Sequence, residues 1–220
     1  MAVSFTEKVK TLFNLIKNPK ELSALLSLRH SGFLMEKGWF NAFNSGEPID
    51  FNLKPIPWFT YSAVDFLGKR LNKKMKVLEF GSGNSTLYFG EKVERAISVE
   101  HDLNWYNRLK KIIPPNVNLV LSKADSSGSY INPITEFKIS FDIIVIDGLF
   151  RNECCKEGVE LLSSSGVIIL DDSERTEYYE GINYIISKDF RRIDFWGISA
   201  GYLYRKATSI FYKSTNCLNI

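Results

Sequence analysis

The sequence predicts an α/β fold built on a doubly wound, mostly parallel sheet. Residues 76–80 read as a short apolar strand, residues 81–83 as a glycine-rich turn, and Asn84 as the cap of a following helix. Strands and helices then alternate along the chain, as parallel βαβ units require. Residues 141–146 and 166–170 are continuous apolar runs, which is typical of strands buried on both faces of a sheet.

Composition is that of an ordinary globular protein. The 220 residues suffice for one sizeable α/β domain with an appendage. The net charge of +3 is small and the basic residues are scattered, so we expect no nucleic-acid partner. Three cysteines, two of them adjacent, form neither a disulfide framework nor a zinc spacing, which favours reduced thiols and a cytoplasmic protein. We expect no signal peptide, and no membrane span, because no apolar run approaches ~18 residues.

The N-terminal region predicts two helices and a lid. Apolar residues recur at helical spacing from Phe5 to Ile16, with lysines opposite them, and Asn18-Pro19 separates this helix from a second one. We expect the first helix to pack on its own domain; the alternative is that this basic amphipathic helix lies on a membrane surface. Residues 32–50 are rich in aromatic side chains and broken by Gly and Pro, which indicates a loop or lid over a site.

The remaining elements divide the chain into an N-terminal helical appendage and lid, residues 1–72, and a main domain, residues 73–220. A helix follows Pro57, and residues 126–135 predict an irregular connection. The last two strands can close the sheet as a hairpin pair. The expected strands are 76–80, 96–100, 117–122, 141–146, 166–170, 190–196 and 208–212, and the expected helices of the main domain are 84–92, 103–113, 152–163 and 175–188.

The glycine-rich turn indicates a ligand site. A strand, a tight turn and a helix N-terminus together present backbone N–H groups to a ligand. The third glycine of the dinucleotide fingerprint is missing, since Thr86 stands at the position that follows Gly81 and Gly83. Glu100 ends the next strand, about twenty residues beyond the turn, which is the spacing at which an acidic residue meets ribose hydroxyls.

Four segments, in order and with suitable spacing, resemble the class I S-adenosylmethionine-dependent methyltransferases. The resemblance spans roughly Met75 to Ser214 and implies a Rossmann-like seven-stranded methyltransferase fold with an antiparallel last strand. It also implies S-adenosylmethionine as the cofactor. The matching segments are VLEFGSGNST (Val77 to Thr86), ISVEHD (Ile97 to Asp102), FDIIVIDG (Phe141 to Gly148) and GVIILDDS (Gly166 to Ser173).

The resemblance further implies roles for residues at the ends of the strands. Glu100 would accept the ribose hydroxyls, Asp125 would lie near the adenine amine, and Asp147 would approach the methionine ammonium or the reacting centre. For Asp125 an Asp-initiated turn is an open alternative, and for His101 an exposed or structural position is one. The full cofactor-binding set is Glu79, Gly81, Gly83, Asn84, Ser85, Glu100, His101, Asp125 and Asp147.

A second acidic set predicts catalytic chemistry. Asp147, Asp171 and Asp172 end two strands that we expect to be neighbours, and three carboxylates there suit Mg²⁺. This resembles the catechol and caffeoyl-type O-methyltransferases, some of which have Asn where this chain has Asp172. The alternative is that these acids are helix caps and cofactor contacts without a metal. Arg151 completes the expected catalytic set; its guanidinium is permanently charged, so it predicts a contact to an acidic substrate rather than a base.

We therefore expect an enzyme that transfers a methyl group from S-adenosylmethionine to a small-molecule acceptor. A looser resemblance at the PIPWFTY and TSIFY segments implies O-methylation in glycan or secondary-metabolite biosynthesis. The alternatives are a nicotinamide-dependent oxidoreductase and a protein that binds S-adenosylmethionine without turnover; the missing glycine and the late aspartate pair disfavour the oxidoreductase. Trp39, Trp58 and Tyr61 are candidates to cover the cofactor or stack on the acceptor, with ordinary packing as the alternative.

Overall fold

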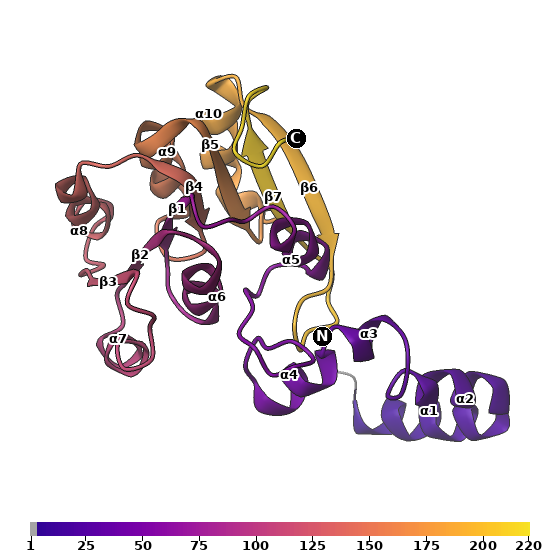
Figure 1. Ribbon diagram of the computed structural model, residues 1–220. Coiled ribbons are helices and arrows are strands. Elements are labelled where there is room, and N and C mark those ends of the chain that lie inside the picture. Colours follow the sequence, from indigo (N-terminus) through magenta and orange to yellow (C-terminus); the bar gives the residue numbers. More distant parts are fainter. Residues whose placement is uncertain (1–3) are drawn as a thin grey trace.

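The computed structural model describes residues 4–220, apart from the side chains of residues 135 and 136. Its centre is a seven-stranded sheet with the order β3-β2-β1-β4-β5-β7-β6 (Figure 1). Strand β7 runs antiparallel to both of its neighbours, and the other pairs are parallel. This confirms the predicted doubly wound, mostly parallel sheet. The strands are β1 Lys76–Phe80, β2 Arg95–Glu100, β3 Val117–Leu121, β4 Phe141–Ile146, β5 Leu162–Asp171, β6 Arg191–Gly197 and β7 Lys206–Tyr212.

Helices cover both faces of the sheet and enclose two apolar cores. Val77 and Ile143 point into one core, together with Phe89 of α6. The next residues along the same strands, Leu78 and Ile144, point into the other core. Successive side chains of a strand alternate between the two faces of the sheet, and here each face packs in an apolar core. Both sets of side chains are therefore apolar, which explains the continuous apolar runs in the sequence. The helices from α5 onward are α5 Tyr61–Gly68, α6 Asn84–Lys92, α7 Leu103–Leu109, α8 Ser127–Ile131, α9 Arg151–Leu161 and α10 Tyr179–Ser187.

Two segments that predicted irregular structure contain short helices. The predicted lid holds α3 Phe33–Glu36 and α4 Trp39–Ser45, and the predicted connection at 126–135 holds α8 and a 3₁₀ helix, Asn132–Phe137. Gly38 and Gly46 flank α4 with left-handed backbones, so these glycines mark helix ends rather than a loop. The Ser129 amide donates to the Ser126 side chain at 3.2 Å, which caps α8.

The segment from α4 to α5 packs on the same core as the sheet. The indole nitrogens of Trp39 and Trp58 donate to the carbonyls of Tyr202 and Ala200, both at 3.0 Å. The Thr60 amide donates to the Thr208 hydroxyl of β7, also at 3.0 Å. Trp39 is buried in the core that contains Val77. This middle segment therefore shares a core with the sheet. The division of the chain at residue 72 stays a prediction.

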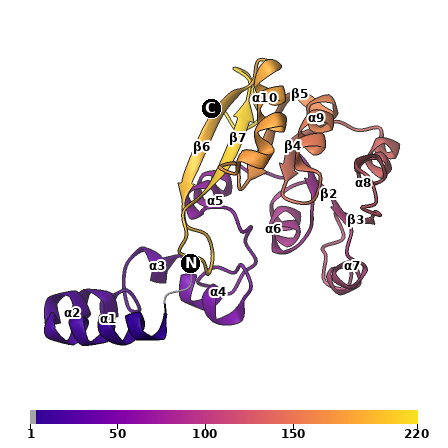
Figure 2. The same cartoon turned by 180° about the vertical axis from the view of Figure 1, so that it is seen from behind.

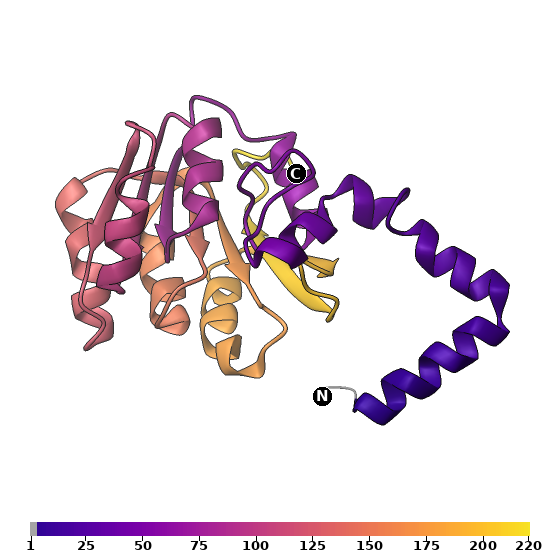
Figure 3. The same ribbon diagram turned by 90° about the horizontal axis from the view of Figure 1, so that it is seen from below.

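The first two helices stand apart from that core. Helices α1 Phe5–Lys17 and α2 Pro19–Ser27 contain no buried residue. Figures 2 and 3 show them projecting from the sheet domain, joined to it through α3. The expectation that the first helix packs on its own domain is therefore wrong, and its apolar face lies open. Among the described residues, the helices are too short or too polar to cross a bilayer.

A pair of glycines in the packed helices α9 and α10 gives a stability test. A Cβ on Gly181 would lie 2.8 Å from Cys155 Cβ and 3.0 Å from Asn152 Cα, whereas a Cβ on Gly158 would make ordinary contacts at 3.5 Å and beyond. We expect Gly181→Ala to lower the free energy of unfolding by about 1–3 kcal/mol through overpacking. Gly158→Ala should raise it by about 0.5–1 kcal/mol, because alanine favours the helix. Urea unfolding followed by circular dichroism measures both, and equal effects would contradict the packing of α10 on α9.

Candidate functional site

The glycine-rich turn lies where the strand order reverses, between β1 and β4 at the carboxyl ends of the parallel strands. Gly81 has a φ of 110°, and a Cβ there would lie 3.1 Å from the Gly148 nitrogen at the end of β4. Glycine is required because the two strand ends approach so closely. Helix α6 begins directly after this turn, at Asn84, so Asn84 is its first residue and not the predicted cap.

Glu79 holds this turn from inside the sheet. Its Oε2 accepts hydrogen bonds from the hydroxyls of Thr86 at 2.5 Å and Ser98 at 2.7 Å. Thr86 in turn accepts from the Gly83 amide at 3.0 Å. Burial raises the pKa of Glu79. Glu79 is buried, and it is linked to the turn through Thr86 of α6, so it supports the shape of the turn instead of presenting a free carboxylate.

Glu100 lies beside the turn at the end of β2 and is 4% exposed. Its Oε1 accepts the amides of His101 at 2.7 Å and Asp102 at 2.8 Å, and its Oε2 accepts the Ser82 hydroxyl. These bonds fix the carboxylate, and a diol that displaced the Ser82 hydroxyl would find an acceptor already oriented. The His101 ring is half-exposed, with Nδ1 3.1 Å from the Glu100 carboxylate.

A small cavity of about 70 Å³ brings together four of the nine predicted cofactor residues, Gly83, Asn84, Ser85 and Asp147. Glu100 does not line it, but Ser82, which donates to the Glu100 carboxylate, does. Asn84 also donates to the Pro48 carbonyl at 3.0 Å, so the segment after α4 contacts the first residue of α6 beside the turn. Nucleoside-sized ligands need several hundred Å³, so the lining side chains must move apart when such a ligand binds. The lining residues are Glu47, Pro48, Trp58, Ser82, Gly83, Asn84, Ser85, Trp105 and Asp147.

Asp125 lies in a turn, which is the alternative that the sequence left open for it. It is exposed, and its carboxylate accepts the Ser129 hydroxyl, which lowers the pKa of Asp125. Asp125 lies in the turn that begins α8, and it is not among the residues that line the cavity beside the glycine turn. The structure therefore gives Asp125 a local hydrogen bond within this turn.

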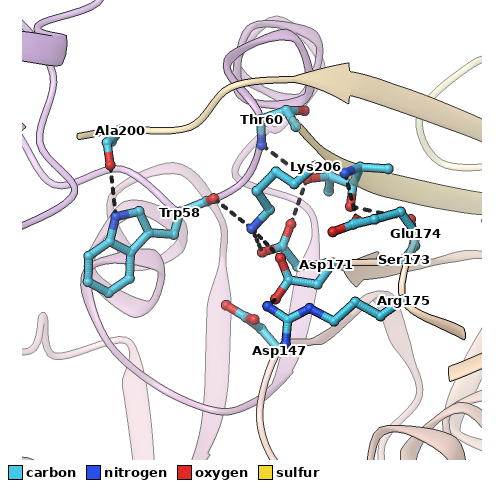
Figure 4. Close-up of polar contacts among 12 residues, drawn as sticks. Trp58, Thr60, Asp147, Asp171, Ser173, Glu174, Arg175, Ala200 and Lys206 are labelled. Atoms are coloured by element: carbon cyan, nitrogen blue, oxygen red, sulfur yellow. Dashed lines mark hydrogen bonds and ion pairs between the residues drawn. The ribbon is translucent and has the colours of Figure 1, made fainter. Parts of the chain in front are cut away.

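The strand-end aspartates surround a lysine that the sequence analysis missed. Lys206 is 3% exposed, and its Nζ lies 2.5 Å from Asp171 Oδ2 and 2.7 Å from Asp172 Oδ1 (Figure 4). It also donates to the Trp58 carbonyl at 3.3 Å. The other Asp171 oxygen accepts the Thr208 hydroxyl at 2.7 Å. The sequence carried one signal for this contact, the expected antiparallel last strand. An antiparallel strand beside β5 brings its first residues to the end of β5.

Burial and opposite charge compete in this cluster. Burial, together with the nearby Asp147 carboxylate, raises the pKa of Asp171 to about 7. Burial alone would lower the pKa of Lys206, but the Asp171 and Asp172 carboxylates outweigh it and the net shift is upward. Lys206 is therefore a permanent cation, and it supplies the charge that the two aspartates need inside the protein.

Two arginines complete the neutralisation. Arg151 Nη2 lies 2.9 Å from Asp147 Oδ1, and the same guanidinium donates to the carbonyls of Gly148 at 3.1 Å and Asp171 at 2.7 Å. Its head joins the ends of β4 and β5 and is 10% exposed; the contact of Arg151 to an acidic substrate stays a prediction. Arg175 lies 2.7 Å from Asp172 Oδ2.

The predicted magnesium set does not fit this geometry. Asp147, Asp171 and Asp172 do converge, but each carboxylate is already paired with a cation of the protein. In the part of the chain that the structure describes, no group of three or more His, Cys, Asp or Glu side chains is arranged to hold a metal ion. Three carboxylates close together would repel one another without a cation, and Lys206, Arg151 and Arg175 relieve that repulsion.

The buried lysine gives a second stability test. Lys206→Met removes the cation and leaves Asp171 and Asp172 buried with less compensation, so we expect the free energy of unfolding to fall by about 3–5 kcal/mol. Lys213→Met, at an exposed position just past the other end of β7, should change it by less than about 0.5 kcal/mol. Guanidinium unfolding measures both variants. A loss below about 1 kcal/mol for Lys206→Met would show that the aspartates do not depend on this cation.

Comparison with known proteins supports the fold. No protein-family model matches the sequence, and a search of curated proteins gives no significant match. Among solved structures, a methyltransferase from Pyrococcus furiosus is similar over 80% of this chain and 94% of its own, with 20% identity and a TM-score of 0.53. A precorrin-6y C5,15-methyltransferase from Geobacter metallireducens GS-15 is similar over 69% of this chain and 88% of its own, with 16% identity and a TM-score of 0.52. The chain therefore has the fold of the class I S-adenosylmethionine-dependent methyltransferases.

Proposed function

We propose that this protein transfers a methyl group from S-adenosylmethionine to an oxygen of a small-molecule acceptor. The observation that carries the proposal is the pre-oriented Glu100 carboxylate beside the Gly81 turn, at the point where the strand order of this fold reverses. A dinucleotide oxidoreductase is less favoured, because the turn lacks the third glycine. The experiments below must distinguish an enzyme from a protein that binds S-adenosylmethionine without turnover.

The cofactor would occupy the cavity beside the turn once its lining side chains move apart. Glu100 would accept the ribose hydroxyls, and the backbone of residues 81–85 would approach the methionine moiety. Asp147 is the strand-end aspartate that lines this cavity, and its carboxyl group is about one-quarter exposed. Its negative charge suits the ammonium or the sulfonium of the cofactor. The cofactor supplies an activated methyl group when it is bound.

A neighbouring cavity suits the acceptor. It has a volume of about 190 Å³ and shares Trp58 with the cofactor cavity. The rings of Trp58 and Tyr202 lie 5.9 Å apart, and Phe43 adds a third aromatic side chain to the lining. Aromatic faces pack well against flat or ring-shaped molecules, so a sugar ring or a phenol fits this cavity better than an extended chain. Glycan and secondary-metabolite biosynthesis supply acceptors of both kinds.

The contribution of the protein to the chemistry is mainly alignment. Trp58 lines both cavities, and its carbonyl accepts a hydrogen bond from Lys206, so the place where donor and acceptor would meet is attached to the ion cluster. Holding the methyl group and the acceptor oxygen in line lowers the entropic part of the barrier. Burial raises the pKa of Asp147 even though Arg151 opposes the shift, and a carboxylate with a raised pKa is a better proton acceptor near neutral pH.

Ligand binding tests the proposed cofactor. At a hundredfold excess over the dissociation constant, S-adenosylmethionine or S-adenosylhomocysteine should add about 2.7 kcal/mol of stability, which is roughly 5–10 °C in melting temperature for a domain of this size. NAD should give no shift. Glu100→Gln should weaken binding of S-adenosylhomocysteine about ten- to a hundredfold, because it removes a charged acceptor of two hydroxyls. Isothermal titration calorimetry measures the affinities.

Glu94→Gln is the matched control, since Glu94 is exposed and directly precedes the same strand; its affinity should equal that of the parent protein. A melting shift with NAD alone would overturn the cofactor assignment. Tight binding of S-adenosylmethionine with no methyl transfer to a panel of phenols and sugars would leave a binding protein and reject the enzyme.

The paired aspartates predict that catalysis does not depend on magnesium. Activity should persist within about twofold after exhaustive treatment with EDTA and should not rise when Mg²⁺ is added, because Lys206, Arg151 and Arg175 already neutralise the carboxylates. The measurement is the rate of formation of S-adenosylhomocysteine. Loss of activity in EDTA with recovery in Mg²⁺ would mean that the ion pairs rearrange to admit a metal.

A further inference from the structure

Helices α1 and α2 carry apolar side chains that the rest of the protein leaves uncovered. Phe5, Leu12, Phe13 and Ile16 are between 56% and 81% exposed. Together with Val9 they fall at i, i+4, i+7, i+8 and i+11, so they line one face of α1. Leu25 and Leu26 of α2 are 47% and 62% exposed. A 13-residue helix is ~20 Å long, so this face is a continuous apolar stripe over the whole length of α1.

The same helices carry the net charge of the protein. Five of the 28 basic residues and two of the 25 acidic residues lie within residues 4–30, so this segment holds the whole formal charge of +3 and the rest of the chain is formally neutral. At 100° per residue, Lys10 and Lys17 lie along one flank of the stripe and Lys8 lies along the other. Long lysine side chains on the flanks of an apolar face can reach toward charged groups beside it.

We propose that α1, together with α2, docks this protein on the surface of an anionic lipid bilayer. An interfacial helix has an apolar face that enters the boundary between headgroups and acyl chains, with basic residues beside it that contact anionic headgroups. The stripe from Phe5 to Ile16 supplies the first part and Lys8, Lys10 and Lys17 supply the second. The docking is peripheral. Because the two helices project from the sheet domain (Figure 3), the site at the strand ends can work while α1 lies on the lipid.

Charge decides between a bilayer and a second copy of the chain. Pairing of two copies through the α1 stripe would bring two segments of formal charge +3 together, and like charges oppose such contact. An anionic bilayer offers apolar depth and opposite charge at the same time. The lipid surface is therefore the occupant that matches both properties of the helix.

The test uses the full chain and vesicles of phosphatidylglycerol and phosphatidylcholine, with flotation as the readout. The parent protein should float with anionic vesicles at low salt and stay in solution with pure phosphatidylcholine. Lys10→Gln/Lys17→Gln should weaken binding about thirtyfold, since each lysine near the surface contributes about fivefold. Phe13→Gln/Ile16→Gln should weaken it at least tenfold without a change of charge. Thr11→Gln/Asn14→Gln, on the polar face of the same helix, is the matched control and should bind as the parent does.

The outcomes separate lipid from protein partners and from the methyltransferase site. Absence of flotation with anionic vesicles at low salt would overturn the proposal. So would flotation that is unaffected by both the lysine and the apolar variants. Sedimentation that shows a dimer, converted to a monomer by Phe13→Gln/Ile16→Gln, would assign the stripe to a second copy instead. Affinity for S-adenosylhomocysteine should be equal in all variants, because none of them touches the sheet domain, and this equality shows that the sheet domain of each variant is folded.

Discussion

The buried contact between Lys206 and the Asp171–Asp172 pair is the interaction on which the functional end of this protein depends. It exists because β7 enters the sheet antiparallel to β5, so that the first residue of β7 meets the last residue of β5. The same lysine reaches the Trp58 carbonyl. A single cation thus joins the central sheet, its antiparallel edge and the segment that leads into α5. The Lys206 ammonium needs its carboxylate partners, since an unpaired buried ion is strongly destabilising.

The part of the site that is contiguous in sequence was predictable, and the part that is assembled from distant segments was not. The sequence could place Gly81 and Glu100 side by side, because a turn and an acid at the end of the next strand leave a pattern within about twenty residues. Lys206 escaped because its role depends on the register of an antiparallel strand, and the sequence predicted that strand to begin two residues later, at Thr208. The metal was predicted because the sequence analysis identified the three aspartates but not Lys206, Arg151 and Arg175 as the cations that pair with them.

The fold itself was largely readable because buried strands must be apolar on both faces. Errors fell where local signals compete. Gly38 and Gly46 suggested a loop, yet glycines with left-handed backbones also end helices. The amphipathic pattern of α1 correctly predicted a helix but not its partner. An apolar stripe indicates that one face of a helix is suited to burial, and it does not identify the surface that buries it. Trp58 was a candidate from the sequence, but the structure alone shows that it lines two cavities and that its carbonyl accepts a hydrogen bond from Lys206.

The contact of α10 with Cys155 of α9 has a consequence for thiol chemistry. Cys155 and its neighbour Cys154 are fully buried, and burial raises the pKa of Cys155 to about 12. Only the thiolate reacts readily with alkylating reagents or disulfides, so in the packed state this sulfur is inert. It becomes reactive when α10 lifts from α9 and water enters. The rate at which a thiol reagent labels Cys155 therefore reports how often this pair of helices opens, and the native chain carries its own probe of local unfolding.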